Sequence, residues 1–209
     1  MGELPIKKNT QDSKLNTKVI LGLVIILLIG SFITVKLVQL NSVGRSATIN
    51  KPTTASHEAF IEAVAPTAVA IQNQEHVPAS ISIAQAALES DWGQSKLAAD
   101  YNNLYGVKGS RFTKNVDLPT KEFEDGKWKT IDQPFRWYDN WNESMWGHAS
   151  LLVNGTDDNA KRYSEVIDSD NYKDAAHALV DGGYATDPDY AEKVIGLIET
   201  YQLDQYDEQ

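Results

Sequence analysis

One carboxylic acid stands out because it ends an almost wholly apolar helical stretch. Glu89 follows the run 84–88 (AQAAL) and is itself followed by Ser-Asp-Trp-Gly. On a helix that begins near Pro78, Glu89 lies one turn from Gln85 and two turns from Ile81, on the flank of the apolar stripe. Apolar neighbours disfavour the charged form of a carboxyl group and raise its pKa, as a general acid at neutral pH requires. The alternative is a glutamate at a helix end that reaches solvent, and position alone leaves both open.

Apolar residues at helical spacing and recognisable caps mark the helices that must position Glu89. Residues 60–64 form a first apolar face that Pro66 is expected to end or kink, and residues 69–71 continue a second piece. Pro78 suits the first position of the helix that carries Glu89. Later helices are predicted over Glu143–Val153, over Tyr172–Val180, and from an N-cap at Asp187 through Tyr190, Val194, Leu197 and Ile198.

Between residues 112 and 137 the pattern changes to short β-strands. Asp125-Gly126, at the centre of TKEFEDGKWKTI, is the strongest short-range signal for a two-residue hairpin turn. That turn predicts three cross-strand pairs: Glu124–Lys127, Phe123–Trp128 and Glu122–Lys129. The aromatic pair then lies on one face of the hairpin and Glu122 on the other. The sequence therefore predicts an α+β domain that is mainly helical with a small inserted β-hairpin.

The N-terminal region has the pattern of a membrane anchor. Val19–Val35 has no charged residue and, extended to Leu40, reaches the length of about 20 residues that crosses a bilayer. Four lysines precede it against two acidic residues, so the positive-inside rule keeps the N-terminus in the cytoplasm. A cleaved signal peptide is the alternative, although its apolar core is usually roughly 7–15 residues long. We expect a cytoplasmic N-terminus (1–18), a single transmembrane helix (19–40), a linker (41–56) and an extracellular, cell-wall-side domain (57–209).

Charge and composition exclude several classes of protein for this domain. Residues 51–209 carry 13 Lys or Arg against 27 Asp or Glu, a net charge of −14, which argues against binding to nucleic acid. The chain has no cysteine, which excludes disulfides and thiolate metal sites. Its four histidines are scattered with no two at ligand spacing, so neither a metal nor another cofactor is expected. The apolar N-terminal run lacks a G-x-x-x-G pairing motif, and a monomer is expected.

Five blocks of the sequence, in order, resemble one known family. They are VPASISIAQAALESDWGQSKLA (77–98), NNLYGVKG (102–109), TKEF (120–123), FRWYDNWNES (135–144) and GGYATDPDYAEKV (182–194). They resemble the glucosaminidase family of peptidoglycan hydrolases, glycoside hydrolase family 73, which includes flagellar and autolysin N-acetylglucosaminidases. The resemblance runs from about Phe60 to Leu203. It implies a lysozyme-like fold, with a helical lobe and a hairpin lobe beside a sugar-binding groove. The implied reaction is hydrolysis of the β-1,4 bond between N-acetylglucosamine and N-acetylmuramic acid in peptidoglycan glycan strands.

The resemblance also implies roles for individual residues. Glu89 matches the glutamate of the family's ALESxWG block, the proposed general acid. Glu122 matches the glutamate of the TTEY block, the proposed second carboxylate, although Lys121 and Phe123 depart from the commoner residues there. Tyr184 matches the tyrosine of the GYATDP block, which lines the reactive sugar. The block NNLYGVKG looks like the turn that leads out of the helix of Glu89. The candidates for lining the sugar groove are Trp92, Asn103 and Tyr105.

Alternatives remain open for these roles and for the function. Glu122 faces a lysine and can be a surface ion pair, Glu124 can be confused with it, and Tyr184 can be a core tyrosine. Two carboxylates suit glycoside hydrolysis, but the substrate's own acetamido group can replace the second as nucleophile. A muramidase or lytic transglycosylase on the same scaffold is a second hypothesis, and a non-catalytic wall-binding protein is a third.

Overall fold

The computed structural model describes the backbone of residues 54–124 and 127–207 and the side chains of residues 57–120 and 129–207. The predicted anchor at 19–40, the segment before it and most of the predicted linker lie outside these residues. Within the described ranges, no helix is both long enough and apolar enough to cross a membrane. The first described helix begins at Thr54. The predicted start of the domain at residue 57 stays a prediction.

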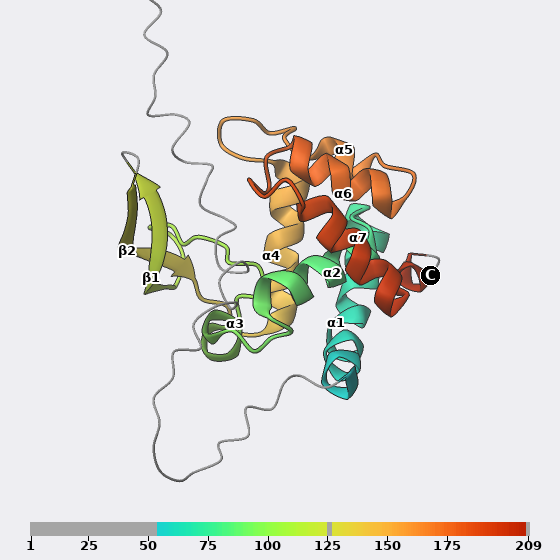
Figure 1. The fold of residues 1–209 in the computed structure, drawn as a ribbon, viewed down its shortest axis with the longest axis horizontal. Helices are drawn as coiled ribbons and strands as arrows, with labels where there is room; N and C mark the ends of the chain where they lie inside the picture. Colours follow the sequence, from blue (N-terminus) through green and yellow to red (C-terminus); the bar gives the residue numbers. More distant parts are fainter. Residues whose placement is uncertain (1–53, 125–126, 208–209) are drawn as a thin grey trace, which may run out of the picture.

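The body of the domain consists of five helices, of which one is central and the other four pack around it (Figure 1). They are α1 (Thr54–Glu75), α2 (Ala79–Ser90), α4 (Trp141–Asn154), α6 (Tyr172–Asp181) and α7 (Tyr190–Tyr201). α2 lies in the middle and packs against the other four and against a final 3-10 turn (Leu203–Tyr206). Every residue of α2 except Leu88 is buried, because its alanines and serines let the neighbouring helices approach closely. Glu89 is therefore placed inside the helical body rather than on its surface.

The first helix runs without interruption through Pro66. The expectation that a helix ends there is wrong, since residues 60–64 and 69–71 belong to the single helix α1. Val64, Ala65 and Ala68 are buried while Pro66 is exposed, so the ring faces solvent, where water can satisfy the carbonyl that loses its partner. The other long helices lie within two residues of the predicted ranges at 143–153 and 172–180.

The chain leaves α2 through a tight turn and enters a further short helix. Asp91 and Trp92 adopt left-handed backbone conformations (φ 51° and 58°), and the Trp92 amide donates to the Ala87 carbonyl at 2.9 Å. Ser95 then caps α3 (Lys96–Tyr101) by accepting a hydrogen bond from Ala98. The block NNLYGVKG consequently follows α3, and the expectation that it leads directly out of the helix of Glu89 is wrong.

The last helix begins two residues later than predicted. The N-cap of α7 is Asp189, whereas the Asp187 side chain accepts a hydrogen bond from the Asp189 amide at 3.0 Å and pairs with Lys193. Asp187 thus closes the turn before the helix instead of capping the helix itself. Three short helical elements of the described residues, α3, α5 (Ser164–Ile167) and the 3-10 turn, were not predicted.

A two-stranded antiparallel hairpin stands to one side of the helices (Figure 1). Its strands are β1 (Asn115–Glu124) and β2 (Lys127–Arg136). Both lie within residues 112–137, where short strands were predicted, and each is ten residues long. The predicted register is confirmed at all three pairs: Glu124–Lys127, Phe123–Trp128 and Glu122–Lys129. The Asp125-Gly126 turn itself lies outside the described residues. The prediction of a mainly helical domain with an inserted hairpin is confirmed.

Candidate active site

Glu89 lies in the last turn of α2 and faces the start of α7. Its side chain is 8% exposed, and its Oε1 accepts a hydrogen bond from the hydroxyl of Tyr190 at 2.8 Å. The same hydroxyl oxygen accepts a hydrogen bond from Gln85 Nε2 at 3.0 Å. Because Gln85 can only donate through this nitrogen, the tyrosine proton is directed toward Glu89. The two helices therefore hold the carboxyl group in one orientation.

Burial sets the protonation state of this carboxyl group. Loss of solvent raises the pKa of Glu89 to about 8, and the hydrogen bond donated by Tyr190 opposes part of that rise. Glu89 is therefore largely a neutral acid at pH 7. In that form Oε1 accepts from Tyr190, and Oε2 carries the proton. Glu89 as a whole residue is 8% exposed, and a general acid must be within reach of the oxygen that it protonates.

A cluster of buried aromatic rings packs against Tyr190. The ring centroids of Tyr184 and Tyr190 lie 5.7 Å apart, and the Tyr184 hydroxyl is 3.0 Å from His148 Nε2. His148 stacks on Tyr105 with 3.9 Å between ring centroids. Burial lowers the pKa of His148 to about 3, so this imidazole is neutral at neutral pH. It consequently adds no positive charge that would favour the carboxylate form of Glu89.

Tyr184 is placed beside this site but is not open to solvent. Its side chain is 1% exposed, and desolvation raises its pKa well above the ordinary value of a tyrosine. Its observed contacts, to Tyr190 and His148, are those of a core residue that positions the partner of Glu89. A direct role of Tyr184 at the reactive sugar stays a prediction.

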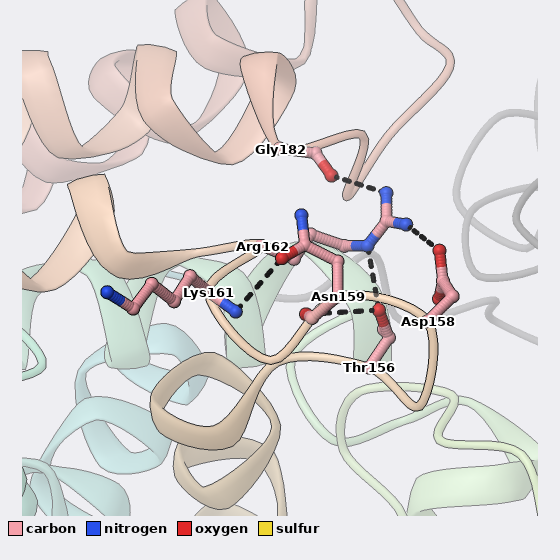
Figure 2. Close-up of polar contacts among 6 residues, drawn as sticks. All are labelled: Thr156, Asp158, Asn159, Lys161, Arg162 and Gly182. Atoms are coloured by element: carbon pink, nitrogen blue, oxygen red, sulfur yellow. Dashed lines mark hydrogen bonds and ion pairs between the residues drawn. The ribbon is translucent and has the colours of Figure 1, made fainter.

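The turn that leads into Tyr184 is held from the surface by Arg162, as Figure 2 shows. Its guanidinium group has three hydrogen-bond partners: Thr156 Oγ1 (2.8 Å), the Gly182 carbonyl (3.3 Å) and Asp158 Oδ2 (2.5 Å). Position 182 has room only for glycine, because a Cβ would meet the Arg162 carbonyl and the Tyr163 ring at 2.8 Å. The loop between α4 and α5 thereby fixes the start of the segment 182–190, which carries both tyrosines of the site.

The three residues predicted to line the sugar groove all make contacts within the fold. Asn103, which is 1% exposed, donates to the Val107 and Arg136 carbonyls at 2.9 and 2.8 Å and accepts from the Val107 amide at 3.0 Å. Tyr105 is fully buried, and its hydroxyl donates to the Ser82 carbonyl at 3.1 Å. Trp92 is partly buried and stacks on His57, 3.8 Å between centroids. Their contribution to substrate binding stays a prediction.

Glu122, the proposed second carboxylate, is described through its backbone alone. It lies in β1 opposite Lys129 of β2, on the hairpin rather than in the helical body. Asn103 connects the two parts, since it joins the loop after α3 to the end of β2. The partners of Glu89 and the strand of Glu122 thus belong to different lobes. No three His, Asp or Glu side chains converge as metal ligands in the part of the chain that the structure describes.

Two residues of the site, Tyr190 and His148, were not predicted from the sequence. Tyr190 lies 101 positions from Glu89, and only the packing of α2 against α7 reveals the hydrogen bond between them. A signal was present, since Tyr190 follows the Thr-Asp-Pro turn and was predicted to belong to the last helix. His148 carried no comparable signal, because a lone histidine on a helix is common in protein cores.

The substitution Tyr190→Phe is expected to raise the pKa of Glu89 further, because the hydroxyl that favours the carboxylate is lost. The basic limb of the pH–rate profile should then move to higher pH, while the unfolding free energy falls by about 1–3 kcal/mol because Gln85 loses its acceptor. The measurement is kcat/KM from pH 5 to 10. Tyr163→Phe is the matched control, since the buried Tyr163 hydroxyl has no hydrogen-bond partner among the described residues. An unmoved limb in Tyr190→Phe would show that Tyr190 does not act on Glu89.

The substitution Asn103→Ala is expected to destabilise the domain strongly. It removes three hydrogen bonds and leaves backbone groups of Val107 and Arg136 without their partner, at a cost of about 2–4 kcal/mol. Urea unfolding measures this loss. Asn154→Ala is the control, because Asn154 is exposed and bonds only within its own helix, so about 0.5 kcal/mol or less is expected. Equal losses in the two variants would contradict a connecting role for Asn103.

Comparison with known proteins agrees with this arrangement. Residues 65–203 match the family model described as mannosyl-glycoprotein endo-beta-N-acetylglucosaminidase. The chain is 48% identical over 171 residues to the exo-glucosaminidase LytG of Bacillus subtilis. This match covers 78% of this chain and 61% of LytG. The chain is also 39% identical over 157 residues to a probable N-acetylmuramidase of Lactococcus lactis. That match covers 74% of this chain and 36% of the relative. The chain thus spans less than two thirds of either relative.

A solved structure shares both the fold and much of the sequence. The crystal structure of the catalytic domain of the autolysin Auto from Listeria monocytogenes superposes with a TM-score of 0.70 at 38% identity. That match covers 75% of this chain and 90% of the Auto domain. A match to the glycoside hydrolase domain of Salmonella typhimurium FlgJ gives a TM-score of 0.57 at 30% identity and covers 70% of this chain and 97% of that domain. With the family model matched over most of the domain, the chain belongs to the glucosaminidase family of glycoside hydrolases.

Proposed function

We propose that this protein is a peptidoglycan hydrolase, an endo-β-N-acetylglucosaminidase with Glu89 as its general acid. The bond cleaved is the β-1,4 bond between N-acetylglucosamine and N-acetylmuramic acid. The observation that carries the proposal is the buried Glu89 carboxyl group, whose pKa of about 8 keeps a proton available at neutral pH. Glycoside hydrolysis needs such a proton on the leaving oxygen when the glycosidic bond breaks.

A second group must support the positive charge that develops on the sugar. We assign this role to Glu122 of β1, which either activates a water molecule or holds the developing charge. The substrate's acetamido group is the alternative nucleophile, and Tyr184 is then the candidate to orient it. Because Glu122 and Glu89 belong to different lobes, their separation changes if the lobes move, and the stereochemical outcome depends on that distance.

Mass spectrometry of borohydride-reduced fragments released from purified peptidoglycan tests the proposal. Fragments that end in reduced N-acetylglucosamine are expected, and Glu89→Gln should abolish them. Ends of reduced or anhydro-muramic acid would instead support a muramidase or a lytic transglycosylase. The name of the Lactococcus relative, a probable N-acetylmuramidase, favours that second candidate. Absence of any release from several wall types would support a non-catalytic wall-binding protein.

The same experiment separates internal from terminal cleavage. The relative with 48% identity is called an exo-glucosaminidase, which favours release of single terminal sugars. An endo-acting enzyme releases oligosaccharides of many lengths at early times, whereas an exo-acting enzyme releases N-acetylglucosamine alone. We propose the endo mode, and a time course that shows only the monosaccharide would overturn it.

We also propose that the protein acts as a monomer tethered to the cell membrane, with its catalytic domain on the wall side. The uncharged segment 19–35 and the lysines before it support this proposal. A soluble variant that comprises residues 51–209 should cleave isolated wall but fail to replace the full chain in cells. Full function of that variant in cells would show that tethering is unimportant.

A further inference from the structure

The positive charge of this acidic domain is concentrated on the loop before β1. Residues 108–114 contain three Lys or Arg and no Asp or Glu, whereas residues 115–136 of the hairpin contain four Lys or Arg and five Asp or Glu. Residues 108–136 contain seven Lys or Arg and five Asp or Glu, a net charge of +2. The rest of residues 51–209 contains six Lys or Arg and 22 Asp or Glu, a net charge of −16. Because the hairpin stands apart from the helices (Figure 1), the two charges are separated in space. An anionic ligand is repelled by the helical body and attracted to the loop before β1.

The loop before β1 displays an aromatic ring and cations together. Phe112 is 82% exposed and is the one large hydrophobic side chain among the described residues to be exposed. The guanidinium of Arg111 lies 4.5 Å from the centre of the Phe112 ring. Lys114 Nζ lies 3.7 Å from the centre of the Trp137 ring and 3.9 Å from Asp139 Oδ1, and this lysine side chain is 56% exposed. An exposed ring and a partly buried ring beside cations suit a ligand with both sugar or peptide surface and negative charge.

Hydrogen bonds within the loop hold this display in one conformation. The Ser110 amide donates to Thr113 Oγ1 at 2.8 Å, and the Phe112 amide donates to Ser110 Oγ at 3.2 Å. Asn115 Nδ2 donates to the Ser110 carbonyl, and Thr113 Oγ1 donates to Asn115 Oδ1, both at 2.6 Å. Gly109 is needed at its position because a Cβ there would collide with the Asn115 amide. A preformed loop loses little conformational entropy when it binds.

We propose that this surface, formed by Arg111, Phe112, Lys114 and Trp137, binds the free carboxylates of the peptide stems of peptidoglycan. This inference rests on the proposed function. Every muramic acid that carries a stem presents carboxylates beside the glycan strand, so a cationic surface on the lobe that carries Glu122 meets them when the strand is bound. The surface thus makes the enzyme select strands that still carry peptides. Carboxylates are complementary in charge to this cationic surface, which favours this ligand over a neutral glycan.

The test compares two substrates that share the same glycan. One is intact peptidoglycan, and the other is glycan from which an amidase has removed the stems. The double variant Arg111→Gln/Lys114→Gln is expected to lose about five- to twenty-fold in kcat/KM on intact peptidoglycan at low salt and nothing on the stripped glycan. The loss should shrink at high salt, because exposed charges are screened. Lys161→Gln/Lys173→Gln, which makes the same charge change at exposed positions of the helical body, is the matched control.

The outcomes distinguish this inference from its rivals and from the proposed function. An equal loss on both substrates, an equal loss in the control, or no loss overturns the inference while the hydrolase stands. A loss that disappears when wall phosphate polymers are removed assigns the surface to those polymers and also overturns it. Unchanged wall hydrolysis together with lost binding to phosphatidylglycerol vesicles assigns the surface to the membrane instead. If the parent chain cleaves neither substrate, the proposed function itself fails.

Discussion

Replacing Glu89 by glutamine is expected to lower kcat on peptidoglycan by at least about 1,000-fold. The amide cannot protonate the leaving oxygen, but its oxygen can still accept the hydrogen bond from Tyr190 that the carboxyl group accepts now. The fold and the substrate affinity should therefore persist while the chemical step is lost. Release of reducing ends measures the rate, and sedimentation of the variant with insoluble wall measures the affinity.

The same variant should respond differently to pH when it unfolds. Burial raises the pKa of Glu89 from 4.5 to about 8, so between these values the folded state binds a proton that the unfolded state has released. This group therefore lowers the stability of the parent as pH rises through that window, by up to about 4–5 kcal/mol. Glu89→Gln lacks this dependence. An unfolding free energy that differs between the parent and the variant by a constant amount from pH 4.5 to 8 would contradict a raised pKa.

Replacing Glu122 by glutamine is expected to lower kcat by about 100-fold or more, with the fold intact. The carboxylate is proposed to activate water or to hold the charge of the transition state, and the amide does neither. Because Glu122 is in a paired strand whose backbone is unchanged by the substitution, the thermal midpoint should move little. Initial rates on purified wall measure the effect.

Glu124→Gln is the matched control for this prediction. Glu124 lies two residues along the same strand, so it shares a face with Glu122 and pairs with Lys127 as Glu122 pairs with Lys129. A surface ion pair alone would make both substitutions nearly neutral. Full activity of Glu122→Gln with anhydro-muramic acid in the products would indicate a lytic transglycosylase, which needs a single essential acid.

Much of the fold was predictable because local sequence signals and tertiary packing agree. The dipeptide Asp125-Gly126 predicted the register of the hairpin, since a two-residue loop leaves one pairing of the flanking residues, and the observed pairs agree. Pro66 failed as a boundary because α1 turns that residue toward solvent, which only the packing of its buried neighbours decides. Asp187 failed as a cap because its side chain bonds to the turn before the helix, an equally favourable use of an aspartate.

The candidate site was predictable at Glu89 and less so around it. Apolar neighbours on α2 indicated a desolvated carboxyl group, and its raised pKa agrees with that reasoning. Its hydrogen-bond partner was not predictable, because Tyr190 comes from another helix through long-range packing. Asn103 and Tyr105 were predicted to line the groove because they lie in the block NNLYGVKG, and their polar atoms bond to the backbone of the fold. Their contact with substrate stays a prediction.

The central claim is that Glu89 is a neutral acid at the pH at which the enzyme works. Carbon-13 NMR of the glutamate side-chain carboxyl groups, assigned by comparison with Glu89→Gln, measures its titration directly. One resonance, missing in the variant, is expected to titrate with a midpoint near pH 8. A midpoint between about 4 and 5, the ordinary range of an exposed glutamate, would contradict the claim.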